Sequence, residues 1–278
     1  MNELERKYYE DAAFWEGEML QDSRNMERFG VTNDLIPDGA ISLLDVGCGN
    51  GVFVDYVSKH KPGLYVHALD RSKEALKHVH VEKTLGDVTN LPFENNSFDC
   101  VSCLEVIEHL PIPAFREALS ELTRVANKYV LLSVPYQEVL EDSYTRCPSC
   151  KTIFNWELHL RRFTDDSFKT LLKEYGFKSV STRKAGGHRY LKYHTQFRKI
   201  FYPEQFLRWN SPICPLCGYE EKNPTGQLLA TSNGHERNVP TPKRKLISYL
   251  TGLPKLFWPR ETKYYWIIGL FEREWKPS

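Results

Sequence analysis

Glycine recurs at every second position in one short segment, Gly47-Cys48-Gly49-Asn50-Gly51, which follows an apolar run and precedes a helical pattern. Glycines at such a junction permit a tight turn and let a ligand approach the backbone, while the following helix offers free N–H groups. A dinucleotide fingerprint would need its third glycine at position 52, where the chain has Val52. Asp45, just ahead of the glycines, suits a ligand that carries an amino group better than a pyrophosphate. The segment predicts a small-ligand site; the alternative is a tight turn without a ligand.

Acidic side chains follow the next apolar segments in turn. Asp70, Asp87 and Glu105 each stand at or just after the end of such a segment, and His109 follows closely. A carboxylate at position 70 can accept hydrogen bonds from both hydroxyls of a ribose. Asp87 can accept one from an adenine amino group. Each residue alone is more often a loop or capping residue, but together they outline a site for an adenosine with a polar tail.

Two Cys-x-x-Cys pairs are the second feature with specific chemistry: Cys147 with Cys150, and Cys214 with Cys217. Each turn points two thiolates at one centre, so two such turns complete a tetrahedral four-thiolate zinc site. Four thiolates leave no open coordination position, which predicts a structural Zn²⁺. Two alternatives stay open: His159 replaces one of the cysteines, or each pair is a separate redox site.

Strands alternate with helices along most of the chain, which predicts an α/β fold with a doubly wound, parallel sheet. In such a sheet, ligands bind beyond the carboxyl ends of the strands. The predicted strands are 41–46, 64–69, 83–88, 98–104, 129–134, 178–183 and 264–271. The predicted helices are 52–60, one from about 73, 114–125 and 165–175, the last closed by Gly176.

The stretches between these elements predict three parts. Residues 1–40 form an N-terminal helical part that closes over the site as a lid or packs on the core. Two stretches are too long for ordinary connections, and we expect them to build one small accessory lobe with both cysteine pairs. The α/β core is expected at 41–140, 163–184 and 263–273, and the accessory zinc and substrate lobe at 141–162 and 185–262.

The net charge of +1 hides an asymmetry. Residues 1–182 hold 20 basic and 29 acidic side chains, whereas residues 183–278 hold 17 basic and 7 acidic ones. Either the C-terminal part faces an anionic partner, or the two parts attract each other.

The motifs LLDVGCGNG, ALDRS, LGDVTNLPFENNSFDCVSCLEVIEHL and YVLLSVP resemble those of the class I S-adenosylmethionine-dependent methyltransferases. The resemblance covers about residues 40–135, with a weaker match at HLRRFT and LLKEYGF, and is nearest to the branch of the ubiquinone-biosynthesis O-methyltransferases. It implies a Rossmann-like, seven-stranded sheet with the last strand antiparallel, and S-adenosyl-L-methionine as the cofactor. Many relatives lack the cysteine pairs, so the resemblance says little about zinc.

The resemblance also implies cofactor-binding roles, residue by residue. The glycines would lie under the methionine part, and one acid on each of the first strands would hold a polar group. The implied set is Gly47, Gly49 and Gly51 for the methionine part, Asp45 for its amino end, Asp70 for the ribose hydroxyls, Arg71 beside the adenine, Asp87 and Val88 for the adenine edge, and Glu105 near the donor methyl group.

Methyl transfer from a sulfonium needs an aligned nucleophile and a site shielded from water, and a hydroxyl acceptor also gains from a base. His109 has a suitable ordinary pKa and position for that base; the alternative is a histidine that only bonds loop backbone. His159 is the second catalytic candidate, through contact with the acceptor.

The basic and aromatic segment Pro242–Leu250, with Leu256–Trp258, has three candidate partners: a membrane surface carrying a lipid-linked acceptor, an anionic metabolite such as a phosphorylated sugar, or RNA. A packed lid with a solvated charged face is the fourth interpretation. Nucleic acid is the least favoured partner because the chain as a whole lacks a basic excess. No apolar run is long enough for a membrane span and no secretory signal is evident, so we expect a cytoplasmic protein, with peripheral contact at the inner membrane face as an extension.

These features predict a methyltransferase, most simply an O-methyltransferase acting on a small molecule or a sugar or envelope-glycan precursor. An RNA methyltransferase and a catalytically inactive cofactor-binding scaffold are the alternatives.

Overall fold

The computed structural model describes residues 9–10, 15, 23–191, 213–220 and 259–274. The basic and aromatic segment within 242–258 and most of the predicted N-terminal lid lie outside the described residues.

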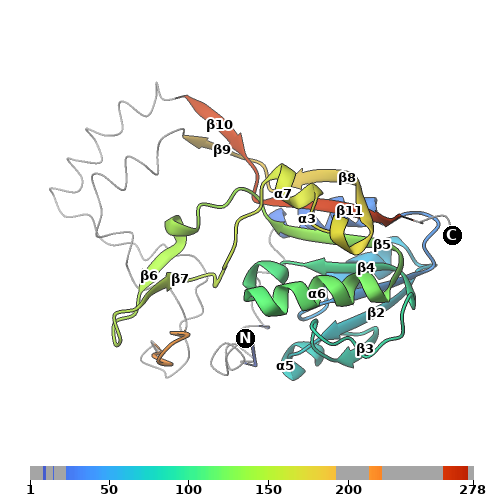
Figure 1. Ribbon diagram of the computed structural model, residues 1–278, viewed down its shortest axis with the longest axis horizontal. Coiled ribbons are helices and arrows are strands. Elements are labelled where there is room, and N and C mark those ends of the chain that lie inside the picture. The colour runs from blue at the N-terminus through green and yellow to red at the C-terminus, as the bar shows by residue number, and fades with distance from the viewer. Residues whose placement is uncertain (1–8, 11–14, 16–22, 192–212, 221–258, 275–278) are drawn as a thin grey trace.

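Seven strands form one sheet in the order β3-β2-β1-β4-β5-β11-β8 (Figure 1). Neighbouring strands pair in parallel except at β11, which is antiparallel to both β5 and β8. This confirms the predicted doubly wound α/β fold and the antiparallel last strand. The bounds are β1 Ser42–Val46, β2 Tyr65–Asp70, β3 Glu82–Leu85, β4 Phe98–Leu104, β5 Ala126–Pro135, β8 Phe177–Ala185 and β11 Trp266–Arg273.

Helices cover both faces of the sheet, because its central strands are apolar on both sides. Adjacent Leu43 and Leu44 are fully buried in separate hydrophobic clusters, one on each face. Buried residues of α6 and α7 join one cluster, and those of α3, α4 and α5 join the other. The helices are α3 Ser23–Leu35, α4 Val52–His60, α5 Lys73–Leu76, α6 Ile112–Val125 and α7 Asp165–Lys169.

The predicted continuous helix 165–175 is wrong. The α-helix α7 ends at Lys169, and a separate 3₁₀ turn, η4, spans Lys173–Tyr175 before Gly176 (φ 79°). At the break, the Thr170 hydroxyl donates to the Asp166 carbonyl at 2.8 Å. Beyond it the backbone continues in tighter 3₁₀-type turns, with Leu171 N–H donating to the Phe168 carbonyl and Tyr175 N–H to the Leu172 carbonyl, both at 3.1 Å. Such turns keep the apolar spacing close to that of an α-helix, so apolar spacing alone overextended this helix.

Two small antiparallel pairs extend from the carboxyl-end edge of the sheet (Figure 1). The hairpin β6 (Tyr144–Arg146) and β7 (Ile153–Asn155) follows β5 by way of the 3₁₀ turn η3 (Leu140–Ser143). The pair β9 (His188–Leu191) and β10 (Arg260–Lys263) follows β8 and precedes β11. Both predicted insertions therefore leave the core at the edge where ligands are expected.

Among the described residues, no helix combines the length and the apolar character that crossing a bilayer requires.

Candidate active site

A cavity of about 730 Å³ opens at the carboxyl ends of β1, β2, β4 and β5. Its position matches the ligand-binding edge of a doubly wound sheet, and its size suits a small molecule. The strand order changes direction at β1: β2 and β3 lie on one side of it, and β4 and β5 lie on the other. The connections after β1 and β4 therefore leave in opposite directions, and a crevice forms between the ends of these strands. The predicted site residues that line the cavity are Asp45, Gly47, Gly49, Asp70, Arg71, Glu105, His109 and His159.

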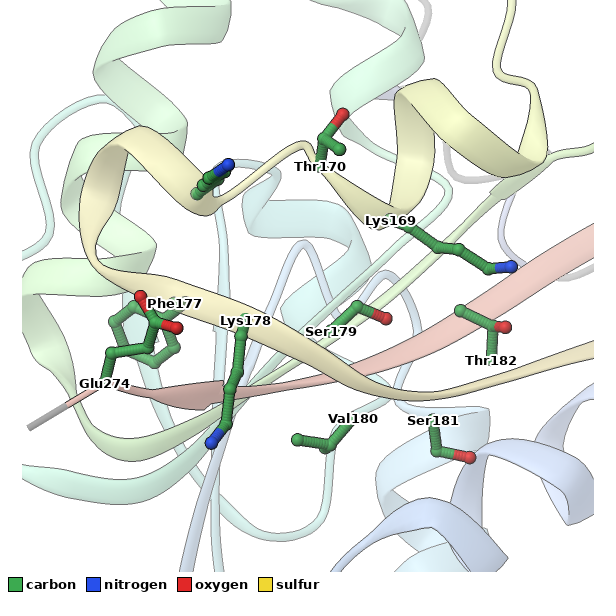
Figure 2. Close-up of a pocket in the computed structure, with 10 residues that line it drawn as sticks. Lys169, Thr170, Phe177, Lys178, Ser179, Val180, Ser181, Thr182 and Glu274 are labelled. Atoms are coloured by element: carbon green, nitrogen blue, oxygen red, sulfur yellow. The ribbon is translucent and has the colours of Figure 1, made fainter.

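A second, smaller hollow of about 360 Å³ lies along β8, the outermost strand on one side of the sheet. Figure 2 shows the ammonium groups of Lys169 and Lys178 pointing in different directions there. Lys178 forms an ion pair with Glu272 at 3.7 Å. Because the polar groups do not converge, we assign no site to this hollow.

The glycine segment turns sharply between β1 and α4. Gly47 and Gly49 have φ angles of 77° and 57°, a region that side chains rarely adopt. A Cβ atom at Gly47 would lie 2.4 Å from Val106, and one at Gly49 would lie 2.8 Å from the Trp15 ring. Val106 and Trp15 thus fill the positions that side chains at Gly47 and Gly49 would take, while the backbone of both glycines lines the cavity.

Asp70 holds this loop in place from the end of β2. Its carboxylate accepts hydrogen bonds from the backbone N–H groups of Gly49 and Ser72, both at 2.8 Å. Burial raises the pKa of Asp70, and the backbone donors counteract that rise. Asp45 lies deeper, accepts a hydrogen bond from the Ser102 hydroxyl at 2.6 Å, and has its pKa raised by burial to about 7.

The described N-terminal residues lie against the same loop. The carbonyl of Trp15 accepts from the Asn50 side chain at 3.1 Å, and the carbonyl of Tyr9 accepts from the Ser72 hydroxyl at 2.7 Å. The Arg71 guanidinium lies 6.0 Å from the Tyr9 ring centroid. These contacts place aromatic side chains beside the predicted nucleoside position.

Three predicted cofactor residues do not line the cavity. Gly51 packs against Val79: a Cβ atom at Gly51 would lie 3.0 Å from that side chain. Gly51 therefore allows the start of α4 to pack closely against Val79. The Asp87 carboxylate accepts from the backbone and the hydroxyl of Thr89 at 2.9 and 2.8 Å. Val88 is buried in the hydrophobic core.

Glu105 stands at the end of β4 in a left-handed conformation, with φ 56°. Its carboxylate accepts from the Ser133 hydroxyl at 2.7 Å and from the Trp266 indole at 2.8 Å. Arg28 of α3 forms an ion pair with it at 3.3 Å. Arg28 and Trp266 both line the cavity, and no sequence signal distinguished them because each reaches Glu105 from a distant element.

His109 and His159 come together although they are 50 positions apart. Their ring centroids lie 4.8 Å apart in an edge-to-face arrangement. Glu138 lies 2.6 Å from Nδ1 of His159. Nδ1 of His109 and both carboxylate oxygens of Glu108 are buried without a hydrogen-bond partner among the described residues. Glu157 completes this group, at 3.8 Å from His159.

Burial gives the two histidines opposite properties. Burial, together with the charge of His159, lowers the pKa of His109 to about 3, so its imidazole is neutral. Burial also opposes the charged form of His159, but the hydrogen bond with Glu138 and the nearby carboxylates outweigh it and raise its pKa to about 9. Ligand-capable atoms of Glu108, His109 and His159 lie within 4.8 Å of one another, a set able to hold a proton or a cation.

The segment after His159 is tied to the core. The Leu160 N–H donates to the Glu108 carbonyl at 2.9 Å, and Arg161 donates to the Ile107 carbonyl at 3.2 Å. Glu108, Glu138 and Glu157 were not singled out from the sequence; their only local signal is proximity to the histidines.

The four paired cysteines form a separate cluster. Sulfur atoms of Cys147 and Cys217 lie 3.7 Å apart, as do those of Cys150 and Cys214. All four lie within 4.8 Å of one another. His159 belongs to the cavity group instead.

Comparison with known proteins agrees with this geometry. Residues 44–132 match the family model described as a methyltransferase domain. The chain is 32% identical over 101 residues to the ubiquinone biosynthesis O-methyltransferase of Albidiferax ferrireducens, which covers 32% of this chain and 39% of that protein. The chain thus spans about two fifths of that relative.

Solved structures share the fold at low identity. One is the complex between the Haloferax volcanii Trm112 methyltransferase activator and a methyltransferase (TM-score 0.56, 13% identity, 99% of both chains). Another is the magnesium protoporphyrin IX methyltransferase of Synechocystis PCC 6803 with bound S-adenosylhomocysteine (TM-score 0.51, 16% identity, 66% of this chain and 92% of that chain).

Fold and cavity together define a doubly wound α/β domain built to hold a small ligand at its switch point. More narrowly, residues 44–132 match a methyltransferase domain, and the sheet has the fold of solved methyltransferases, as the resemblance predicted. The residues present fit S-adenosylmethionine: the backbone of Gly47 and Gly49 lines the cavity, and Nη2 of Arg71 is buried without a hydrogen-bond partner among the described residues.

Proposed function

We propose that this protein transfers the methyl group of S-adenosylmethionine to a hydroxyl group of a small molecule, or of a sugar or envelope-glycan precursor. One observation carries the proposal: a single cavity joins the glycine cradle and Asp70, at β1 and β2, to the buried pair His109 and His159, near β4 and β5. The cofactor, when bound, supplies an electrophilic methyl group. The protein then has to align the acceptor and exclude water.

The cofactor half of the cavity is assigned to the loop and the strand ends. Backbone of Gly47 and Gly49 would support the methionine part, with Asp45 beneath its amino end. Asp70 and Arg71 would hold the ribose and face the adenine. Glu105, fixed by its three partners, would lie near the donor methyl group. Asp87 and Val88 stay assigned to the adenine edge by resemblance alone.

The acceptor half is assigned to the histidines. Neutral His109 has an Nδ1 without a hydrogen-bond partner among the described residues, and this atom can accept a hydrogen bond from the acceptor hydroxyl and take its proton as the new bond forms. His159, held protonated by Glu138, can donate to another oxygen of the acceptor. His188, Tyr190 and Lys263 also line the cavity, and their polar groups can hydrogen-bond a sugar-like acceptor.

The zinc assignment is supported by two matching turns. In each pair the first cysteine's N–H donates to the carbonyl five residues on, Thr152 or Tyr219, at 2.9 Å. In each pair the residue after the second cysteine is left-handed: Lys151 has φ 64° and Gly218 has φ 71°.

The sulfur separations support a metal over disulfides. A tetrahedral ion with Zn–S bonds of about 2.3 Å places its sulfurs about 3.8 Å apart, whereas a disulfide requires about 2.05 Å. The 3.7 Å separations fit the ion. All four sulfur atoms lie within 4.8 Å of one another, which favours one shared site over two separate redox sites.

Metal analysis tests this site. We expect one Zn²⁺ per purified chain and its loss in Cys214→Ala. Metal-free wild type that is well folded would contradict the assignment.

Incubation with labelled S-adenosylmethionine and fractionated cell extract tests the reaction. Label in a small-molecule or glycan fraction is the expected result. Label in RNA would favour an RNA methyltransferase instead, and S-adenosylhomocysteine binding without transfer to any fraction would favour an inactive scaffold. Vesicle co-sedimentation would test the inner-membrane contact proposed for the basic segment.

A further inference from the structure

His159 reaches the cavity on the segment that leaves the β6–β7 hairpin. It stands shortly after Asn155, the last residue of β7, whereas its partner Glu138 stands before the hairpin. The His159–Glu138 contact therefore closes the base of the hairpin. The tip of the same hairpin carries Cys147 and Cys150.

Backbone and side-chain bonds connect the hairpin base to His159. The Asn155 side chain donates to the Leu140 carbonyl at 3.1 Å and accepts from the Glu157 N–H at 2.9 Å. The Trp156 N–H donates to the Ser143 carbonyl at 2.9 Å. The direction in which this segment enters the cavity is thus set by the hairpin.

The hairpin is too short to be stable by itself. Each strand has three residues, and isolated two-stranded hairpins are marginal in water. Its tip is held through the sulfur contacts of Cys147 with Cys217 and of Cys150 with Cys214. The cysteine cluster is therefore the contact that supports the hairpin at its far end.

The second cysteine pair lies in the sequence between β9 and β10. Figure 1 shows β6–β7 and β9–β10 as two separate projections from the core. His188, Tyr190 and Lys263 of β9 and β10 line the cavity, whereas no residue of 213–220 does. The four-cysteine cluster joins the tip of the β6–β7 hairpin to the described segment 213–220.

We propose that metal in the four-cysteine cluster fixes the acceptor half of the active site by ordering the β6–β7 hairpin and so positioning His159. The inference rests on the proposed function and on the proposed zinc. The cofactor half does not depend on the cluster, because Gly49, Asp70 and Ser72 are bonded to one another within the core.

The consequence of losing the metal is displacement of His159 and not unfolding of the domain. The two hydrophobic clusters of the core and the seven-stranded sheet include no residue of the β6–β7 hairpin. Small displacements of a positioning group cost on the order of 100-fold in rate.

Cys214→Ala is the sharpest variant, because Cys214 lies far in sequence from His159 and an effect there must pass through the cluster. Cys100→Ala is the matched control, since this buried thiol lies in β4 and outside both the cluster and the cavity lining. Four quantities are measured in each: zinc content, hydrogen exchange of residues 156–162, S-adenosylhomocysteine affinity by calorimetry, and label transfer to the extract fraction that wild type labels.

For Cys214→Ala we expect loss of zinc, faster exchange at 156–162, unchanged S-adenosylhomocysteine affinity and transfer reduced on the order of 100-fold, with a higher acceptor concentration for half-maximal rate. Cys100→Ala should match wild type in all four. Zinc loss with wild-type exchange and transfer would overturn the inference.

Wild type stripped with a chelator and reloaded with Zn²⁺ gives the same test should the variant not fold: exchange must rise on stripping and return on reloading. Failure of wild type to bind S-adenosylhomocysteine would overturn the proposed function instead. The exchange comparison would still decide whether metal in the cysteine cluster orders the segment that carries His159.

Discussion

Burial sets the charge state of Asp45. This carboxylate is 2% exposed, and loss of hydration raises its pKa from 3.8 to about 7 despite the Ser102 hydroxyl. Because the folded state binds this proton more tightly than the unfolded chain does, the contribution of Asp45 to stability falls as pH rises from about 4 to about 7. Asp45 therefore lies next to the glycine loop although its ionisation lowers the stability of the folded state.

Asp45→Asn should remove this pH dependence. The unfolding free energy of the variant minus that of wild type should increase between about pH 4 and pH 8 by up to about 4 kcal/mol. Urea unfolding at both pH values measures the change. The variant should also bind S-adenosylhomocysteine more weakly at pH 8. An equal stability difference at both pH values would rule out the raised pKa.

In the proposed reaction, His109 takes the proton of the acceptor hydroxyl. His109→Gln keeps a polar side chain but cannot take the proton, so label transfer should fall about 10²- to 10⁴-fold with S-adenosylhomocysteine affinity unchanged. The pKa of about 3 means that His109 itself adds no pH dependence between about pH 6 and pH 8.

The exposed His60, which stacks on Tyr56 at 4.0 Å, supplies the control His60→Gln. Full activity of His109→Gln would exclude the proton-acceptor role. Turnover that requires added Mg²⁺ or Mn²⁺ would reassign the Glu108, His109 and His159 group to a cation.

At the scale of elements, the turn between β1 and α4 is the proposed cofactor cradle, and its left-handed backbone and close packing require glycine. Gly49 combines φ 57° with the Trp15 ring in contact on one side and Asp70 bonded to its N–H. A substitution there affects the backbone conformation and the packing of Trp15 together.

Gly49→Ala should lower stability by about 1–2 kcal/mol from the left-handed conformation alone, and should weaken S-adenosylhomocysteine binding through displacement of the loop. Gly39→Ala is the control, because a Cβ there meets no atom within 4 Å. Thermal unfolding and calorimetry measure both effects. Wild-type affinity in Gly49→Ala would show that the loop does not cradle the cofactor.

At the scale of the whole molecule, the glycine loop and the cysteine cluster lie in different parts of the structure. The glycine loop follows β1 of the seven-stranded sheet, and the cysteine cluster joins the tip of the β6–β7 hairpin to residues 213–220. Sites without shared partners contribute to stability independently.

S-adenosylhomocysteine at about 100 times its dissociation constant should therefore raise the unfolding free energy of the core by about 2.7 kcal/mol, in zinc-loaded and in stripped protein alike. Thermal unfolding with and without the compound measures the shift. Disappearance of the shift on stripping would mean that the cradle depends on the cluster.

Local pattern determined much of this fold. The predicted bounds of α4 and β4 agree with the structure, because apolar spacing within one element decides how that element packs. It failed at 165–175, where 3₁₀-type bonds such as Leu171 N–H to the Phe168 carbonyl replace the α-helical ones after Lys169. Residue type and spacing also predicted that the glycine loop, Asp70 and both histidines belong to the candidate site.

What the sequence by itself determined is the fold class, the ligand-binding edge of the sheet and the residue types gathered there, all of which follow from short-range periodicity and motif spacing. Only the tertiary structure decided which distant groups meet: Glu105 with Arg28 and Trp266, His109 with His159, and the two cysteine pairs. The physical reason is that such contacts depend on how separate elements pack in space. The residue pattern within one segment does not specify that packing. The burial and the neighbouring charges that shift the pKa values of the two histidines in opposite directions arise only once the elements have packed.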